Sequence, residues 1–184
     1  FGLEPEAESA ALARAGGVDV RDGRAERLPF PDRGVEVVVL DYVAHHVERL
    51  DQALLEAARV AARAVIVLDG WYEPDLPSQR AAAAFDGWLK RIDRRGGMVH
   101  NPCPTAADLV RPFLALPDFE IDLIHRLRLQ PLDLAAVEAR AEVQMGAGGV
   151  EHDRVRLDPL LDEARRHGVT EDGAVLLVAR RSPA

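Results

Sequence analysis

Cysteine is nearly absent from this sequence, and long apolar runs are missing. Cys103 is the single cysteine in 184 residues, so an internal disulfide cannot form, and the chain fits a reducing compartment. The longest apolar runs, such as residues 37–40 and 64–68, are the size of strands. They fall far short of the ~18 residues that a membrane-spanning helix needs. We therefore expect a cytoplasmic protein with no membrane partner.

Basic side chains are outnumbered as well. The 23 lysines and arginines face 31 acidic residues, which leaves a net charge of −8. A protein that grips nucleic acid through a broad basic face has the opposite balance, so we expect no nucleic-acid partner. Hydrophobic residues make up 48% of the chain, enough for one globular domain with a core. Nothing in the sequence indicates the oligomeric state.

The first seventy residues alternate between predicted strands and helices. Apolar periodicity predicts helices at residues 7–15 and 51–62, between strands at residues 1–4, 18–21, 35–40 and 64–68. The run at 35–40 is almost continuously apolar and rich in β-branched residues, which is typical of a buried parallel strand. The alternation predicts right-handed βαβ crossovers and a parallel sheet.

The rest of the chain has a different organisation. It is predicted to hold helices at residues 78–95, 105–116, 133–145 and 158–167, strands at 119–129 and 174–179, and a flexible loop at 146–149. We expect residues 1–70 to supply a cofactor side, residues 71–118 a variable lid on the acceptor side, and residues 119–184 the last strands and helices. All three belong to one domain.

Polar residues follow each predicted strand of the first seventy residues. They are Glu4-Pro5, the group Asp22 to Ala25, the group Asp41 to His46, and the group Asp69 to Tyr72. Ligands of open α/β sheets bind at the carboxyl ends of the strands, where an acid can accept hydrogen bonds from ribose hydroxyls. We therefore assign Glu4 to the ribose of a nucleotide-type cofactor and the loop at Arg24-Ala25 to its adenine edge.

These motifs, taken in order, resemble class I S-adenosylmethionine-dependent methyltransferases of the type 11 group. The matching stretches are Glu4-Pro5, Gly23-Arg24-Ala25, Leu28-Pro29-Phe30-Pro31-Asp32, the strand at 35–40 and His45-His46. The resemblance implies an α/β Rossmann-like fold with a mostly parallel sheet and helices on both faces. It also implies S-adenosyl-L-methionine as cofactor, a small-molecule acceptor, and cofactor contacts from Glu4, Pro5, Arg24, Ala25 and Asp41.

The sequence also departs from the family pattern. The family's first strand and glycine-rich loop have no counterpart, so we expect an N-terminally truncated chain that is inactive by itself, with at least one further βα unit upstream, roughly 30 residues or more. Arg24 stands where the family has an aspartate, and an arginine cannot accept the amino hydrogens of adenine. Ala61-Ala62-Arg63 replaces the usual Lys-Pro-Gly-Gly turn.

Methyl transfer needs alignment more than side-chain chemistry, and a general base helps when the acceptor is a hydroxyl. We predict His46 and His45 as catalytic residues; the alternative is that the pair only starts a helix. We further predict that Trp71, Tyr72, Trp88 and His100 border one acceptor cavity facing Asp41 and His46. The alternative is a helix that packs on the sheet. His100 and Cys103 are too few for a metal site, so we expect no metal.

Two other functions fit the same pattern. A nicotinamide-dependent Rossmann oxidoreductase would also use Glu4, but Lys90 is the only lysine and lies in a predicted helix, away from any hydride-transfer set. A non-catalytic methyltransferase-like binding module is favoured by Arg24 and opposed by the acids at the strand ends.

Overall fold

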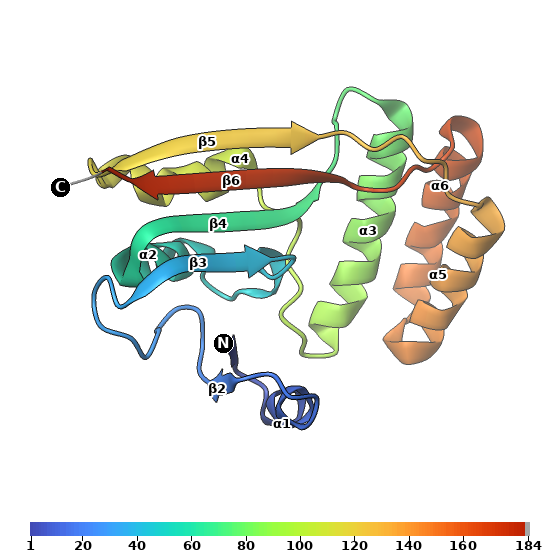
Figure 1. The fold of residues 1–184 in the computed structure, drawn as a ribbon. Helices are drawn as coiled ribbons and strands as arrows, with labels where there is room; N and C mark the ends of the chain where they lie inside the picture. Colours follow the sequence, from blue (N-terminus) through green and yellow to red (C-terminus); the bar gives the residue numbers. More distant parts are fainter. Residues whose placement is uncertain (183–184) are drawn as a thin grey trace.

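The computed structural model describes residues 1–182 (Figure 1). Its strands are β1 (Gly2–Glu4), β2 (Val20–Asp22), β3 (Val35–Asp41), β4 (Ala61–Trp71), β5 (Phe119–Arg126) and β6 (Gly173–Arg181). Its helices are α1 (Ala7–Ala15), α2 (Leu50–Val60), α3 (Pro77–Arg95), α4 (Ala106–Val110), α5 (Leu134–Gly148) and α6 (Glu151–His167), with 3-10 turns η1 (Ala44–His46) and η2 (Arg111–Ala115). The alternation predicted for the first seventy residues is confirmed.

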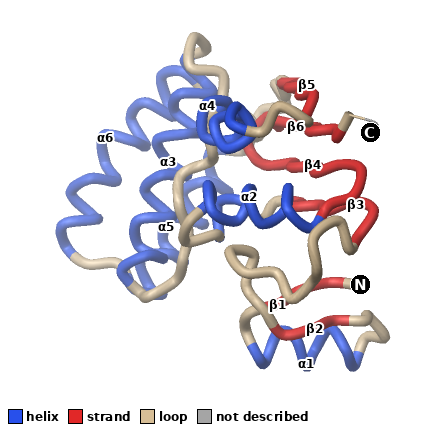
Figure 2. The backbone as a smooth tube through the Cα atoms, turned by 90° about the vertical axis from the view of Figure 1, so that its left-hand side faces the viewer, coloured by secondary structure: helices blue, strands red, loops and turns tan. Residues whose placement is uncertain are grey.

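The strands form two separate sheets. β1 and β2 pair in parallel, and a four-stranded sheet has the order β3-β4-β6-β5. β3 and β4 are parallel, whereas β6 runs antiparallel to both β4 and β5. Both predicted βαβ units are thus present, and the four-stranded sheet is mixed. Among the described residues, β1 and β3 share no ladder, and the unit of β1, α1 and β2 lies below the larger sheet (Figure 2).

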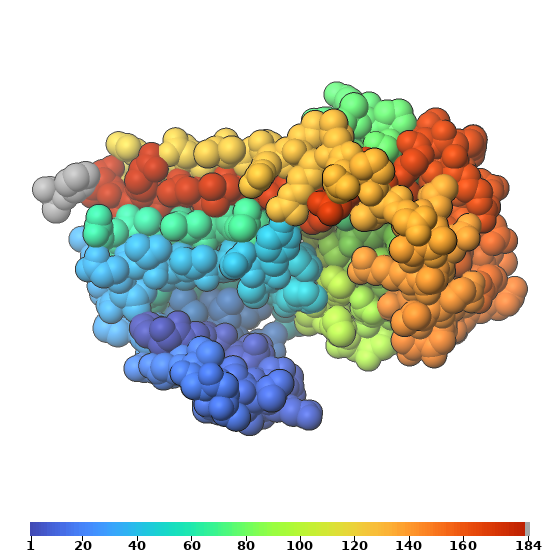
Figure 3. Space-filling model, turned by 45° about the vertical axis from the view of Figure 1, so that its right-hand side comes forward, coloured from blue at the N-terminus to red at the C-terminus, as the bar shows by residue number. Residues whose placement is uncertain are grey.

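One face of the four-stranded sheet carries the main core. Val65 and Val67 of β4 alternate with less buried neighbours and pack with Leu54 of α2 and Phe113 of η2. Burying such side chains contributes roughly 1.5–3 kcal/mol each. The opposite face is open along these strands (Figure 3), where Val39 is 60% exposed. Helices α2 and α4 therefore fix the four-stranded sheet from one side.

A second core lies beyond the carboxyl end of β4. Helices α3, α5 and α6 form a layer there (Figures 1 and 2), joined by a cluster that includes Phe85, Trp88 and Leu157. No helix of residues 1–182 is both long enough and apolar enough to cross a membrane. The layer sets where the loop after α3 returns to the sheet, and this loop carries His100.

Predicted boundaries differ most from the structure in three places. The helix predicted at 105–116 is split into α4 and η2, because Pro112 has no N–H to continue α-helical hydrogen bonding. Helix α6 begins at Glu151 rather than at 158, and Pro159 lies inside it. Asp158-Pro159 has the composition of an N-cap followed by a first helical residue, so the start of α6 was predicted too late in the sequence. Gly146, predicted in a flexible loop, lies in α5.

Candidate active site at the carboxyl edge of the sheet

The chain turns sharply where β3 ends. Tyr42 has a φ of 50°, a left-handed conformation that costs energy for a residue with a side chain. Its N–H donates to the carbonyl of Leu68 at 2.7 Å, which holds the turn against β4. The turn leads directly into η1, so His45 and His46 stand at the edge where ligands of α/β sheets bind.

Asp69 at the end of β4 orients His45. One carboxylate oxygen lies 2.6 Å from His45 Nδ1, and the other accepts the His45 backbone N–H at 3.1 Å. The carboxylate is fully buried and also accepts the N–H of Gly70 at 2.7 Å. Sequence reasoning noted Asp69 as a strand-end acid but gave it no role, because its partner is 24 residues away.

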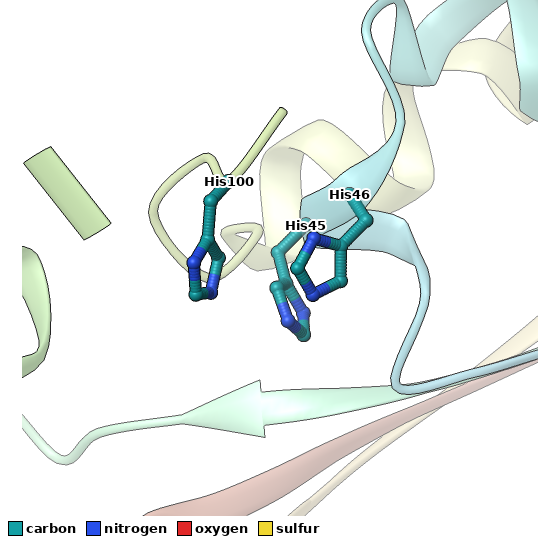
Figure 4. A group of neighbouring side chains, drawn as sticks. All are labelled: His45, His46 and His100. Carbon is teal, nitrogen blue, oxygen red and sulfur yellow. The ribbon is translucent and has the colours of Figure 1, made fainter. Parts of the chain in front are cut away.

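His46 and His100 lie beside His45 (Figure 4). The rings of His46 and His100 stack with centroids 4.5 Å apart, and His45 and His46 are 4.3 Å apart. His46 Nδ1 lies 2.8 Å from the carbonyl of Val99. His100 Nδ1 lies 2.7 Å from the Asp93 carboxylate, yet burial lowers the pKa of His100. The structure thus brings together three of the predicted site residues.

A cavity of about 880 Å³ opens between the β1–β2 unit and β3 (Figure 3). Its lining includes five of the predicted site residues: Glu4, Pro5, Arg24, Ala25 and His46. Asp41 is exposed at the end of β3 and is outside this lining. The cavity therefore extends from the predicted cofactor residues to His46 at the carboxyl edge of the sheet. Its β1 and β3 walls share no ladder in residues 1–182, and the strand predicted to lie between them stays a prediction.

The loop after β2 is held by a residue that sequence reasoning missed. Glu26 is buried, and one carboxylate oxygen accepts the N–H groups of Glu48 and Arg49 at 3.1 and 3.2 Å, at the start of α2. Burial disfavours the charged form, but these N–H groups and Arg24 outweigh it and lower the pKa of Glu26. Arg24 itself pairs with Glu48 at 3.0 Å. Its guanidinium is therefore engaged by carboxylates.

Glu26→Gln should lower the free energy of unfolding by about 1–2 kcal/mol, because the carboxylate accepts two backbone N–H groups from inside the protein. Urea denaturation followed by circular dichroism measures the change. Glu48→Gln is the matched control, since the Glu48 side chain is 66% exposed and surface ion pairs contribute little. Equal effects of the two substitutions would show that Glu26 does not anchor the loop.

The prediction that Trp71, Tyr72, Trp88 and His100 border one acceptor cavity is wrong. Trp88 is 1% exposed in the core of α3, α5 and α6, and its Nε1 donates to the carbonyl of Asp153 at 3.0 Å. Trp71 packs against His125 of β5, with the ring centroids 4.5 Å apart. Tyr72 lines a different cavity of about 450 Å³. Helix α3 buries its aromatic face against α5 and α6, so only His100 lies beside His46.

Comparison with known proteins shows which family and which solved structures this chain is similar to. Residues 1–68 match the family model described as a methyltransferase domain. The matched residues contain β1 to most of β4, and hence every element that borders the 880 Å³ cavity. A search of curated protein sequences finds no match.

Solved structures resemble the chain along its whole length. The YcgJ protein from Bacillus subtilis is 21% identical, with a TM-score of 0.66 over 100% of this chain and 82% of that one. A putative methyltransferase from Bacillus halodurans is 16% identical, with a TM-score of 0.58 over 99% and 82%. A geranyl diphosphate methyltransferase in complex with S-adenosylmethionine is 16% identical, with a TM-score of 0.51 over 98% and 67%. The predicted Rossmann-like methyltransferase fold is confirmed.

Proposed function

We propose that this protein transfers a methyl group from S-adenosylmethionine to a small-molecule acceptor. The cavity carries the proposal, because Glu4, Pro5, Arg24 and Ala25 line it together with His46. The strand predicted to lie between β1 and β3 would occupy part of this space, so the proposal rests on the residues at the strand ends and not on the cavity's volume. One cavity thus reaches from the strand ends that suit an adenosine moiety to the histidines that suit an acceptor.

The cofactor side depends on Glu4. Its carboxylate stands at the end of β1, and one oxygen accepts the N–H of Glu6 at 3.0 Å. That hydrogen bond orients the carboxylate and leaves its other oxygen for the ribose hydroxyls. The loop at Arg24-Ala25, held by Glu26, presents backbone groups to the adenine. Arg24 is no obstacle, since its guanidinium already pairs with Glu48.

The acceptor side depends on the histidines. S-adenosylmethionine supplies an activated methyl group, so the residues need to align an acceptor and, for a hydroxyl, remove its proton. His46 lines the cavity and its Nδ1 is engaged by the Val99 carbonyl, so its Nε2 is the nitrogen that takes the proton. His45, which the buried Asp69 orients, lies beside His46 and helps to position its ring. We place this enzyme in the cytoplasm, where the thiol of Cys103 stays reduced.

Glu4→Ala in the full-length protein should weaken binding of S-adenosylmethionine by about 1–3 kcal/mol, the scale of hydrogen bonds to a charged group. Isothermal titration calorimetry measures the affinity. Glu8→Ala is the control, because Glu8 is an exposed acid of α1 outside the cavity lining. Unchanged affinity in Glu4→Ala would refute the ribose assignment.

The same calorimeter separates the alternatives. Titration with S-adenosylmethionine should release heat and titration with NAD should not. Binding of NAD alone would favour the oxidoreductase. A protein that binds S-adenosylmethionine but keeps it intact against a panel of hydroxyl and amine acceptors would be the non-catalytic module.

A further inference from the structure

Three histidines from two distant segments converge at the carboxyl edge of the sheet. His45 and His46 come from η1 and His100 from the loop after α3. One ring nitrogen of each lies within 4.8 Å of the others. Figure 4 shows the three side chains lying next to one another.

The hydrogen bonds of the three rings fix which nitrogens are free. Each Nδ1 is paired with an oxygen that can only accept: Asp69 for His45, Val99 for His46 and Asp93 for His100. Each Nδ1 therefore carries the proton when the ring is neutral. Each Nε2 then has a bare lone pair, and no donor within residues 1–182 bonds to it.

The surroundings of the rings are built to hold this tautomer. Metal-binding histidines almost always donate their second ring N–H to a carboxylate or a backbone carbonyl, which orients the ring and raises its basicity. Asp69 is fully buried and fixed by backbone N–H groups. Asp93 is held by the side-chain amide of Gln144 from α5. Both carboxylates are thus locked before any ligand arrives.

We propose that His45, His46 and His100 bind one divalent transition-metal ion through their three Nε2 atoms, with zinc as the first candidate. Imidazole suits zinc, copper, iron and nickel, and a three-histidine set leaves a position for water or an acceptor oxygen. Zinc–nitrogen bonds of about 2.0–2.1 Å place ligand nitrogens roughly 3.3 Å apart, so small side-chain rotations close the site.

This site replaces the sequence-based expectation of no metal. That expectation considered His100 only with Cys103, but the Cys103 thiol lies against Lys90 Nζ at 3.2 Å. Cys103 is not among the residues whose ligand atoms lie together, and burial raises the pKa of its thiol to about 11. The third ligand comes instead from η1. The metal proposal needs neither cofactor nor acceptor, but a metal bound to His46 Nε2 would take that nitrogen out of the role of general base.

Metal binding can be measured on the untagged 184-residue chain after treatment with a chelator. Titration with Zn²⁺ in a calorimeter should give one site per chain, and Co²⁺ should give visible absorption bands of a nitrogen-ligated ion. His46→Ala and His100→Gln should each weaken Zn²⁺ binding at least about tenfold, and Asp93→Asn should weaken it by about tenfold as an orienting residue. His125→Ala and His152→Ala, which lie outside the cluster, should bind like the unchanged protein.

Circular dichroism of each variant shows that a loss of binding is not a loss of folding. His100→Gln is the safer second variant, because His100 lies in a loop and glutamine retains a polar side chain. Absence of saturable one-to-one binding in the unchanged chain would overturn the proposal. Undiminished binding in the folded double variant H46A/H100Q would overturn it equally.

Discussion

Replacing Trp88 by alanine should lower the free energy of unfolding by about 3–5 kcal/mol. The side chain is 1% exposed and stacks on Phe85 with centroids 5.8 Å apart, so its removal leaves a cavity between α3 and α6 that the helices cannot close. It also leaves the carbonyl of Asp153 without the indole N–H. Urea denaturation measures this change in the free energy of unfolding. It is followed by backbone circular dichroism, because that signal does not depend on the tryptophan that is removed.

Trp88→Phe is the matched control for this prediction. Phenylalanine keeps most of the apolar volume and loses the N–H donor, so the expected loss is only about 1–2 kcal/mol. A variant W88A as stable as the unchanged protein would contradict the core assignment. It would return Trp88 to the predicted role of an acceptor-pocket wall, in which its replacement by alanine should impair acceptor use more than cofactor binding.

The β-strands of the cofactor side could be predicted because their signals are local. An apolar run rich in β-branched residues indicates a strand, and residues 35–40 show one in the sequence itself. The expected burial of this strand is wrong for the described residues, because β3 lies at the edge of the four-stranded sheet and Val39 is 60% exposed. The cap of α4 is equally local: Thr105 accepts the N–H of Asp108 at 3.1 Å, and the Asp108 carboxylate returns to Thr105 N at 3.0 Å. In such places the residues that make the structure are neighbours in the chain.

The partners of α3 could not be predicted in the same way. The periodicity of residues 77–95 shows that one face is buried, but it does not say against which element. The lid prediction assumed the sheet edge, whereas α5 and α6 supply the contact through residues such as Leu157. Those partners lie some seventy residues further along the chain, and no local signal connects them.

The sequence predicted the three histidines of the cluster but not the carboxylates that orient them. His45-His46 stands after a predicted strand, and strand ends are where sites occur. His100 was placed near His46, and their rings do stack. The carboxylates that set the tautomers, Asp69 and Asp93, were given no role. Asp69 lies 24 residues from His45, and Asp93 in α3 meets His100 only because the loop after α3 folds back.

Asp153→Ala should lower the free energy of unfolding by about 2–4 kcal/mol, the second large effect that we expect. The carboxylate is fully buried at the start of α6, where it accepts the N–H of Val150 at 3.0 Å and pairs with Arg95. It also lies 3.7 Å from Arg91, whose Nε and Nη2 have no hydrogen-bond partner within residues 1–182. Removing the carboxylate therefore leaves cationic groups in the helical layer without their counter-charge.

The same carboxylate predicts how stability depends on pH. Burial disfavours its charged form, but the Val150 N–H and Arg95 prevail and hold the pKa of Asp153 below its usual value. A carboxyl whose folded pKa is lowered contributes stability above its unfolded pKa of about 3.9, and the contribution disappears as pH falls through the folded pKa. Urea midpoints of the unchanged protein should therefore decline more steeply below pH 4 than those of Asp153→Asn, whose side chain does not titrate. Parallel declines of the two proteins would mean that other carboxyls govern acid unfolding and that Asp153 does not secure the α3–α6 contact by its charge.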